Sequence, residues 1–222
     1  MDNTSATPAA PHPKDDLRRH FRRRRRQHLP AAAEGLLAVA RRDLCAFLEP
    51  QASLPPQRLG LYWPIAAEPD LRPLAAELQA QAPDRLALPA VLPWPPGASD
   101  LQLLYLPWDP ADPLVDDACG IPAPPAPAPQ DPGPLAPGQL ALLLVPALAI
   151  DRAGIRLGSG GGWYDRLRAD PAWQALPALA VLPAACITAA LPRDPWDIPF
   201  DGWIDEHDCQ LTPAGRRKIA SS

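Results

Sequence analysis

Cysteine and histidine are scarce in this chain of 222 residues, which has four of each. The cysteines are scattered, at Cys45, Cys119, Cys186 and Cys209. No two of them have the spacing of paired metal ligands, and the histidines form no His-Glu-x-x-His pattern, so we expect no zinc site. Because the start of the sequence also lacks the apolar segment of a signal peptide, we expect a cytoplasmic protein with reduced thiols.

The chain also lacks long apolar runs. No stretch approaches the roughly 18 uninterrupted apolar residues of a membrane span, and the start lacks the apolar segment of a signal peptide. The formal net charge is -4, which argues against nucleic-acid binding over the whole surface. The basic run 22–26 is an exception, but acidic residues flank it and its helix has a partly apolar face. We therefore favour a solvated helix face over a nucleic-acid arm, and expect no nucleic-acid or membrane partner.

Proline, by contrast, is abundant, with 34 residues, or about 15% of the chain against a usual 5% or so. The apolar fraction of 47% is ordinary for a globular protein. We interpret the excess proline as loops around a folded core. The length suits one large domain or two small ones.

The apolar pattern alternates between helix and strand spacing along the chain. Residues 1–13 are small and punctuated by proline, so we expect a disordered tail. Apolar spacing predicts helices at 14–27, 31–48 and 71–81 and from 164 onward. Predicted strands occupy 59–63, 85–89, 101–106, 140–145, 179–182 and 203–204. Residues 121–137 contain too much proline for a helix or central strand and are expected to form a surface loop. This alternation predicts an α/β fold with a mostly parallel sheet.

A glycine-rich loop is predicted between a buried strand and a helix. It contains Gly158, Gly160, Gly161 and Gly162 within five positions. Ordered glycine costs roughly 0.5–1 kcal/mol of backbone entropy relative to alanine, so close approach of a ligand would explain the cluster. Successive glycine amides can form an anion-binding concavity, and Arg156 suits bidentate contact with phosphate. A tight structural turn remains the alternative.

The usual nucleotide motifs do not fit this loop. A Walker loop would need Gly-Lys-Ser/Thr, and a dinucleotide fingerprint would need glycine where Trp163 stands. Asp165 lies in the first turn of the following helix. It would either complement the helix dipole or hold Mg²⁺ beside bound phosphates.

A longer segment resembles a known family. Val145-Pro-Ala-Leu-Ala-Ile-Asp-Arg-Ala-Gly-Ile-Arg-Leu-Gly-Ser-Gly-Gly-Gly-Trp-Tyr-Asp-Arg is similar to the pattern P-x-hydrophobic-x-F-D-x-x-G-x-R-L-G-x-G-x-G-x-Y-D of 5-formyltetrahydrofolate cyclo-ligases. Further pieces agree in order, namely Lys14-Asp-Asp-Leu-Arg18, the segment 62–68, Cys119-Gly-Ile-Pro-Ala-Pro and Pro195-Trp-Asp-Ile-Pro. The resemblance implies one α/β domain over 14–210, with a doubly wound, mostly parallel sheet between helices in a Rossmann-like three-layer sandwich. Residues 211–222 would form a C-terminal tail.

The resemblance also implies a reaction. In the presence of Mg²⁺, such enzymes convert 5-formyltetrahydrofolate and ATP to 5,10-methenyltetrahydrofolate, ADP and phosphate. The γ-phosphoryl group of ATP activates the formyl oxygen, the folate N10 attacks the formyl carbon, and phosphate leaves as the ring closes. No covalent nucleophile is needed, so the protein would act by positioning and charge neutralisation. We expect a monomer.

The resemblance assigns roles to residues of this chain. Arg156 and Lys14 are the expected catalytic residues. The expected ATP site comprises Lys14, Arg18, Arg156, Leu157, Gly158, Ser159, Gly160, Gly161, Gly162, Trp163 and Tyr164. Asp165 and Asp197 are the expected metal ligands, and Glu68 would contact the pterin or its formyl group. Trp63 would bind substrate, and Trp63 and Trp196 could stack on the pterin or the adenine. Without the resemblance, a basic surface patch, a turn aspartate, a helix-start glutamate and core tryptophans would explain most of these residues.

The chain departs from the family pattern at several positions. Ile150 replaces a phenylalanine, Trp163 the first of two tyrosines and Asp205 a common threonine, and Gly161 stands where some members carry lysine. These departures leave two alternatives open. One is an inactive relative that still binds folate or nucleotide, and the other is an ATP-dependent enzyme of the same fold with another substrate.

Overall fold

A seven-stranded sheet forms the centre of the computed structural model, which describes residues 13–48, 57–128 and 130–220. Its strand order is β12-β11-β9-β6-β1-β2-β3. The strands are β1 (Arg58–Gly60), β2 (Leu86–Pro93), β3 (Leu101–Pro107), β6 (Leu140–Pro146), β9 (Ala178–Val181), β11 (Gly202–Ile204) and β12 (Cys209–Leu211). Only the edge strands β3 and β12 pair antiparallel to their neighbours within this sheet, which confirms the predicted mostly parallel α/β architecture.

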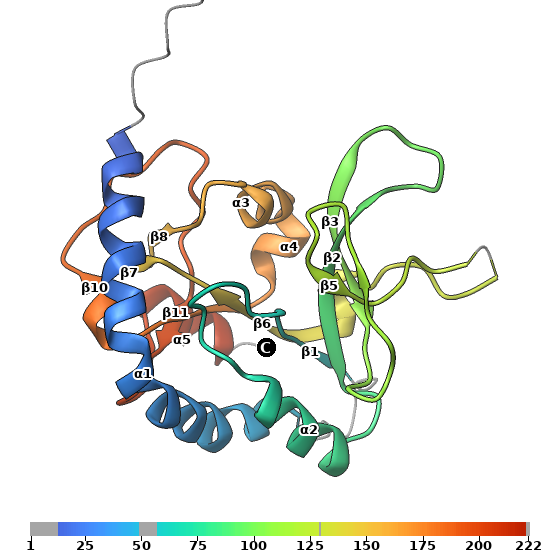
Figure 1. The fold of residues 1–222 in the computed structure, drawn as a ribbon, viewed down its shortest axis with the longest axis horizontal. Helices are drawn as coiled ribbons and strands as arrows, with labels where there is room; N and C mark the ends of the chain where they lie inside the picture. Colours follow the sequence, from blue (N-terminus) through green and yellow to red (C-terminus); the bar gives the residue numbers. More distant parts are fainter. Residues whose placement is uncertain (1–12, 49–56, 129, 221–222) are drawn as a thin grey trace, which may run out of the picture.

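Two small sheets and five helices complete the described fold (Figure 1). One small sheet has the order β10-β7-β8, from Ile187–Thr188, Ala149–Asp151 and Arg156–Leu157. The other pairs β4 (Val115–Asp116) with β5 (Pro122–Ala123). The helices are α1 (Pro13–Leu48), α2 (Arg72–Gln81), α3 (Trp163–Arg168), α4 (Pro171–Ala175) and α5 (Pro213–Ile219), with short 3-10 turns η1 (Pro137–Gln139) and η2 (Ala184–Cys186).

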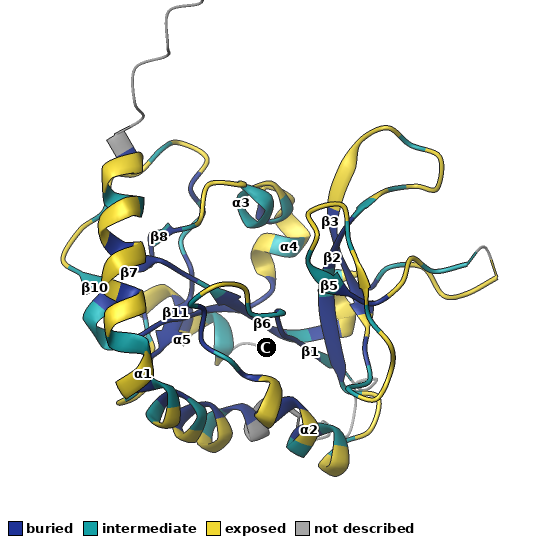
Figure 2. Cartoon of the chain, in the orientation of Figure 1, coloured by how far each residue is buried: buried dark blue, intermediate teal, exposed yellow. Residues whose placement is uncertain are grey.

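Alternate residues of the central strands face two separate cores. In β6, Leu142 and Leu144 pack under the second half of α1 and under α2, whereas Leu143 and Val145 pack toward α3 and α4. This is the period of two that a sheet buried on both faces requires. Figure 2 shows the resulting layers, with buried strands inside and helices exposed along their outer surfaces. The three-layer arrangement is therefore confirmed.

The long N-terminal helix differs from the prediction. Two helices were expected on either side of Pro30, but α1 continues from Pro13 to Leu48 with Pro30 inside it. Figure 1 shows α1 bending sharply in its middle. A proline removes one helical hydrogen bond and its ring pushes against the preceding turn, which kinks a helix without ending it when both halves are packed.

Several short elements also differ from the sequence predictions. β1 ends at Gly60, shorter than the predicted strand 59–63, although the amide of Leu61 still donates to the carbonyl of Ala87 in β2 (2.9 Å). The expected tail 211–222 contains the end of β12 and the helix α5, which begins at the N-cap Thr212. The expected loop 121–137 contains β5 and the first residue of η1, and it buries Ala123 and Leu135. Residues 1–12 of the predicted N-terminal tail lie outside the described residues.

The topology creates a crevice next to β1. From β1 the chain moves outward to β2 and β3, then returns to β6 on the other side of β1. In open α/β sheets, ligands bind at such a reversal, beyond the carboxyl ends of the two strands. Among the described helices, none combines the length and the apolar character needed to cross a membrane.

Candidate active site

A cavity of about 480 Å³ lies at the reversal point of the sheet. Tyr62 and Trp63, which follow β1, and Pro146, which ends β6, form part of its wall. The structure brings all the predicted site residues to this cavity: Lys14, Arg18, Trp63, Glu68, Arg156, Leu157, Gly158, Ser159, Gly160, Gly161, Gly162, Trp163, Tyr164, Asp165 and Asp197. The first half of α1 and the glycine loop therefore form one site with segments from the centre and the end of the chain.

The glycine loop requires glycine for two different reasons. Gly160 has φ +114° and Gly162 has φ +65°, conformations that other residues adopt only with strain. Gly158 has ordinary geometry, but a Cβ atom there would lie 2.9 Å from the guanidinium nitrogens of Arg156. The left-handed conformations of Gly160 and Gly162 shape the loop, and the missing side chain of Gly158 lets Arg156 lie directly against the loop backbone.

Three arginines hold the carbonyl groups of this loop. Arg18 Nε donates to the carbonyl of Gly158 (3.3 Å), and Arg22 donates to that of Ser159 (2.8 Å). Arg166 donates from α3 to the carbonyl of Gly161 (3.0 Å). Across residues 13–48, 57–128 and 130–220, no hydrogen bond is donated by the amides of 158–162. Because the carbonyls are engaged and these amides are not, the loop has several N–H groups available for an anion.

Arg156 is a nearly buried cation at the side of the cavity. Its side chain is 7% exposed, and its guanidinium lies 5.3 Å from the ring centres of both Tyr164 and Phe200. It donates to the carbonyl of Pro146 (3.2 Å) and lies 3.9 Å from Asp165 Oδ1. Its Nε is buried without a hydrogen-bond partner. A cation held this way, with a carboxylate only at the limit of an ion pair, favours binding of a further anion in the cavity.

Lys14 contacts two carboxylates of the segment that follows β10. Its Nζ lies 2.7 Å from Asp194 Oδ2 and 2.5 Å from Asp197 Oδ2. Burial alone would lower the pKa of Lys14, but the hydrogen bonds to these carboxylates outweigh it and raise the pKa. Lys14 is therefore charged at neutral pH, and it fixes residues 194–197 against the start of α1.

The two expected metal ligands have different surroundings. Asp165 is partly exposed beside Arg156, whereas Asp197 is buried against Lys14. In the described part of the chain, no cluster of three or more His, Cys, Asp or Glu residues has the arrangement of a metal site. Mg²⁺ characteristically takes one or two protein carboxylates and completes its coordination with phosphate oxygens and water. Both carboxylates line the cavity, so these residues fit a phosphate-bound Mg²⁺ but not a site made by protein alone.

Glu68 and the aromatic residues form other parts of the cavity wall. Glu68 is 8% exposed, its Oε2 accepts a hydrogen bond from the amide of Ile65 (3.1 Å), and burial raises its pKa. Trp63 packs edge to face against Trp108 with ring centres 6.4 Å apart. Trp196 is 63% exposed, unlike a core tryptophan, and is therefore accessible to a ligand. Desolvation raises the pKa of Tyr164 to about 12, so its hydroxyl group is neutral.

Sequence reasoning missed Asp117, which also lines the cavity. Its carboxylate accepts hydrogen bonds from the amides of Val91 (2.8 Å), Cys119 (2.8 Å) and Ile121 (3.0 Å). Asp117 thereby fixes the turn before β5 against β2. Aspartate at the first position of a turn and glycine three residues later, at Gly120, is a pattern that could have indicated this turn.

Comparisons with known proteins identify the family and the fold. A sequence model described as the 5-formyltetrahydrofolate cyclo-ligase family matches residues 11–205. A 5-formyltetrahydrofolate cyclo-ligase from Mycolicibacterium smegmatis is 42% identical over 57 residues, a segment that spans 26% of this chain and 29% of that protein. The NMR structure of Aquifex aeolicus 5,10-methenyltetrahydrofolate synthetase superposes with a TM-score of 0.62 at 27% identity, covering 90% of this chain and 93% of that chain. A 5,10-methenyltetrahydrofolate synthetase from Mycoplasma pneumoniae has the same fold, with a TM-score of 0.60 at 20% identity over 88% of this chain and 100% of that chain.

Proposed function

Because the chain belongs to the 5-formyltetrahydrofolate cyclo-ligase family, we propose that it converts 5-formyltetrahydrofolate to 5,10-methenyltetrahydrofolate with ATP and Mg²⁺, releasing ADP and phosphate. One observation carries the proposal. Lys14 and Arg18 of α1 meet Arg156 and the glycine loop, which lie more than a hundred residues later in the chain, in one cavity at the reversal point of the sheet. Several cations beside backbone amides without partners form the kind of site that a polyphosphate requires.

The polyphosphate would lie between the first half of α1 and the glycine loop. Arg156 and the amides of 158–162 would bind its oxygens, and Lys14 and Arg18 would approach from one face of α1. Asp165 and Asp197 would hold Mg²⁺, which neutralises phosphate charge when it is bound. Lys14 contacts Asp197 in the structure, so a bound cation and Lys14 would share this carboxylate.

The folate would occupy the part of the cavity lined by Trp63 and Glu68. Trp196, which directly precedes Asp197 and also lines the cavity, would stack on either the pterin or the adenine. The formyl oxygen would take the γ-phosphoryl group as its bond to ADP breaks. N10 would then attack the formyl carbon and lose its proton to water, and phosphate would leave with the formyl oxygen as the ring closes. The chain's own contribution is to align the two substrates, to exclude water and to stabilise the charge on the transferring group. No residue needs to form a covalent bond with substrate.

The departures from the family pattern affect this proposal unequally. Ile150 is fully buried in β7 and does not line the cavity, so its replacement of phenylalanine changes packing rather than ligand contacts. Trp163 does line the cavity, and the guanidinium of Arg166 lies 4.3 Å from its ring centre. The departures at the site itself are therefore Trp163 and Gly161, which also lines the cavity.

A direct assay tests the proposed function. Purified protein, 5-formyltetrahydrofolate, ATP and Mg²⁺ are expected to give the methenyl product, followed by its near-ultraviolet absorbance. A sample without ATP is expected to give little product, because no phosphoryl donor is present. A sample without Mg²⁺ and an Asp165→Asn variant are also expected to give little product, because the negative charge of the phosphates is then not neutralised. Nucleotide binding without product would indicate another substrate, and neither binding nor product would indicate an inactive relative.

Arg22 provides a test of the glycine loop as the phosphate site. Arg22→Ala is expected to raise KM for ATP about 3- to 10-fold with little change in kcat, because one hydrogen bond that orders the loop is lost. Steady-state kinetics with varied ATP at saturating folate would measure the change.

Arg23→Ala is the matched control. Arg23 is exposed on the same helix, and it forms no hydrogen bond or ion pair within the part of the chain that the structure describes. It should leave KM for ATP close to the wild-type value. Equal effects of the two substitutions would instead indicate a general effect of helix charge and would remove the specific role of Arg22.

A further inference from the structure

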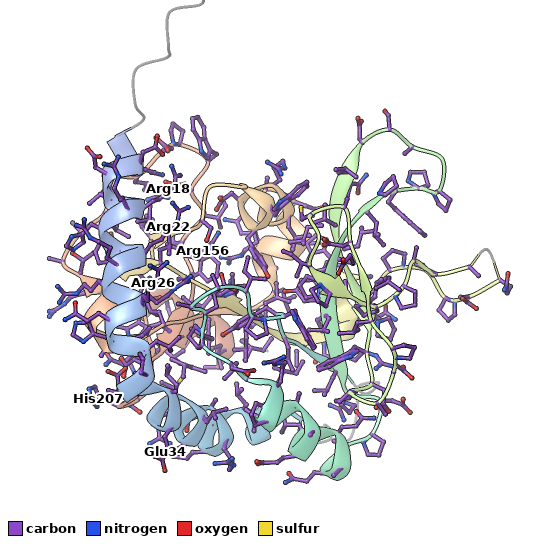
Figure 3. The ribbon with its side chains drawn as sticks, in the orientation of Figure 1. Arg18, Arg22, Arg26, Glu34, Arg156 and His207 are labelled. Carbon is purple, nitrogen blue, oxygen red and sulfur yellow. The ribbon has the colours of Figure 1, made fainter. Side chains whose placement is uncertain are left out.

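Arg25 is the buried member of the run of arginines on α1. Its side chain is 6% exposed, whereas its arginine neighbours at positions 22, 23, 24 and 26 are exposed. Figure 3 shows the labelled Arg18, Arg22 and Arg26 following α1 on the side of the glycine loop. Arg25 lies on the helix face that also buries Phe21, where core packing would favour an apolar side chain. A charged residue at such a position is the kind of departure that a functional requirement explains.

The guanidinium of Arg25 connects the two chain segments that make the crevice. Its NH1 donates a hydrogen bond to the carbonyl of Ala147, which directly follows β6 (3.1 Å). The same nitrogen lies 3.7 Å from Glu68 Oε1, in the segment that follows β1. Arg25 does not itself line the cavity, but Glu68 does. Any effect of Arg25 on a bound substrate would therefore act through Glu68.

Few charged groups of the described residues surround the buried pair of Arg25 and Glu68. Glu68 is faced by Arg25 from α1, Arg156 from β8, Tyr62 from the segment after β1 and Tyr164 from α3. Burial raises the pKa of Glu68, whereas Arg25 and Arg156 act in the opposite direction. The groups that face Arg25 are Glu68, Arg22, Tyr62 and the thiol of Cys186, and burial lowers its pKa. Two buried charges at this distance stabilise one another, and removing one of them leaves the other uncompensated.

We propose that Arg25 is a positioning residue that holds the Glu68 carboxylate ionised and fixed at the wall of the folate part of the cavity. An ionised carboxylate only accepts hydrogen bonds. It would therefore bind an N–H edge of the pterin ring, and it would be repelled by the formyl oxygen, which also only accepts. This inference rests on the proposed function, and it decides between the two contacts that Glu68 could make with the substrate.

The test compares pH profiles of kcat/KM for the folate substrate in wild type, Arg25→Gln, Arg25→Lys and Glu68→Gln. In wild type, activity should fall on the acid side as Glu68 becomes protonated. Arg25→Gln removes a nearby positive charge, so Glu68 should bind its proton more tightly and the acid limb should move to higher pH. KM for the folate should rise roughly 10-fold while KM for ATP changes little. Arg25→Lys keeps the charge and should keep the acid limb near the wild-type position.

Two further variants separate positioning from a structural effect. Arg26→Gln removes an exposed arginine from the neighbouring position and should change neither the acid limb nor KM. In a Glu68→Gln background, Arg25→Gln should produce no further rise in KM for the folate, because its partner is already neutral. A loss of activity that is equal at all pH values, with both KM values unchanged, would overturn the proposal.

A measurement without substrate makes failure of this inference distinguishable from failure of the proposed function. The Glu68 carboxyl carbon can be titrated by NMR in the free protein, in wild type and in Arg25→Lys and Arg25→Gln. A higher pKa of Glu68 in Arg25→Gln, with Arg25→Lys close to wild type, supports the pairing whatever reaction the enzyme catalyses. An unchanged pKa in folded Arg25→Gln overturns it. If Arg25→Gln does not fold by itself, recovery of folding in the Arg25→Gln, Glu68→Gln double variant supports the pairing, because no unpaired buried carboxylate is then left, and a failure to recover overturns it.

Discussion

Arg156→Met is expected to lower kcat/KM about 1,000-fold, the largest loss of activity among the substitutions considered. The substitution removes a nearly buried guanidinium between Tyr164 and Phe200, at the point where phosphate charge would develop. Preorganised donors in a water-poor site typically contribute two to three orders of magnitude to rate, because they need no reorganisation during the reaction. Steady-state assays of methenyl product formation would measure the loss, and the fold would be checked by circular dichroism.

Two related variants identify the cause of the loss. Arg156→Lys retains the charge but not the planar fork, so it should recover only about a tenth of the wild-type activity. Arg152→Ala changes an exposed arginine of the preceding turn, which lies outside the cavity, and should retain nearly full activity. Activity of Arg156→Met within a few-fold of wild type would exclude Arg156 from charge stabilisation.

The position of the glycine loop and Arg156 at the cavity could be predicted because their sequence pattern is local. The motif places four glycines, an arginine and a helix start within a few residues, so no long-range packing is needed to interpret it. The mostly parallel sheet could also be predicted from the sequence, since the apolar runs of β6 and β9 are continuous and are separated by helical segments. The small strands β7, β8 and β10 have two or three residues each, too few for a periodic pattern.

Contacts between distant parts of the chain could not be predicted in this way. Lys14 was assigned to phosphate and Asp197 to a metal, and nothing in the sequence connects two residues that are separated by 183 positions. Within the arginine run, composition gives no reason to choose Arg25 over its neighbours. Only the position of α1 against the crevice determines which arginine is buried next to Glu68. The partners of Lys14 and Arg25 therefore became known only from the three-dimensional arrangement of distant chain segments.

Gly154→Ala is expected to cause a large loss of stability, about 3–4 kcal/mol in the free energy of unfolding. Gly154 has φ +87°, and a Cβ atom there would lie 2.3 Å from the backbone carbonyl oxygen of Phe200. The left-handed conformation costs an ordinary residue roughly 1–2 kcal/mol. A clash with a backbone atom adds about as much again, because neither of the two backbone segments can move away easily. Chemical denaturation with the folded and unfolded baselines fitted would measure the difference.

Gly97→Ala separates the two causes. Gly97 has the same φ of +87°, but a Cβ atom there would have no atom within 4 Å. It should therefore lose only the roughly 1–2 kcal/mol that belongs to backbone conformation. The Phe200 amide donates a hydrogen bond to the Gly154 carbonyl (2.8 Å), and the Phe200 ring packs against Arg156. Gly154→Ala should consequently also raise KM for ATP in the protein that remains folded, whereas Gly97→Ala should not. Equal losses of stability in the two variants would show that the close contact between the 151–155 turn and Phe200 does not contribute to the fold.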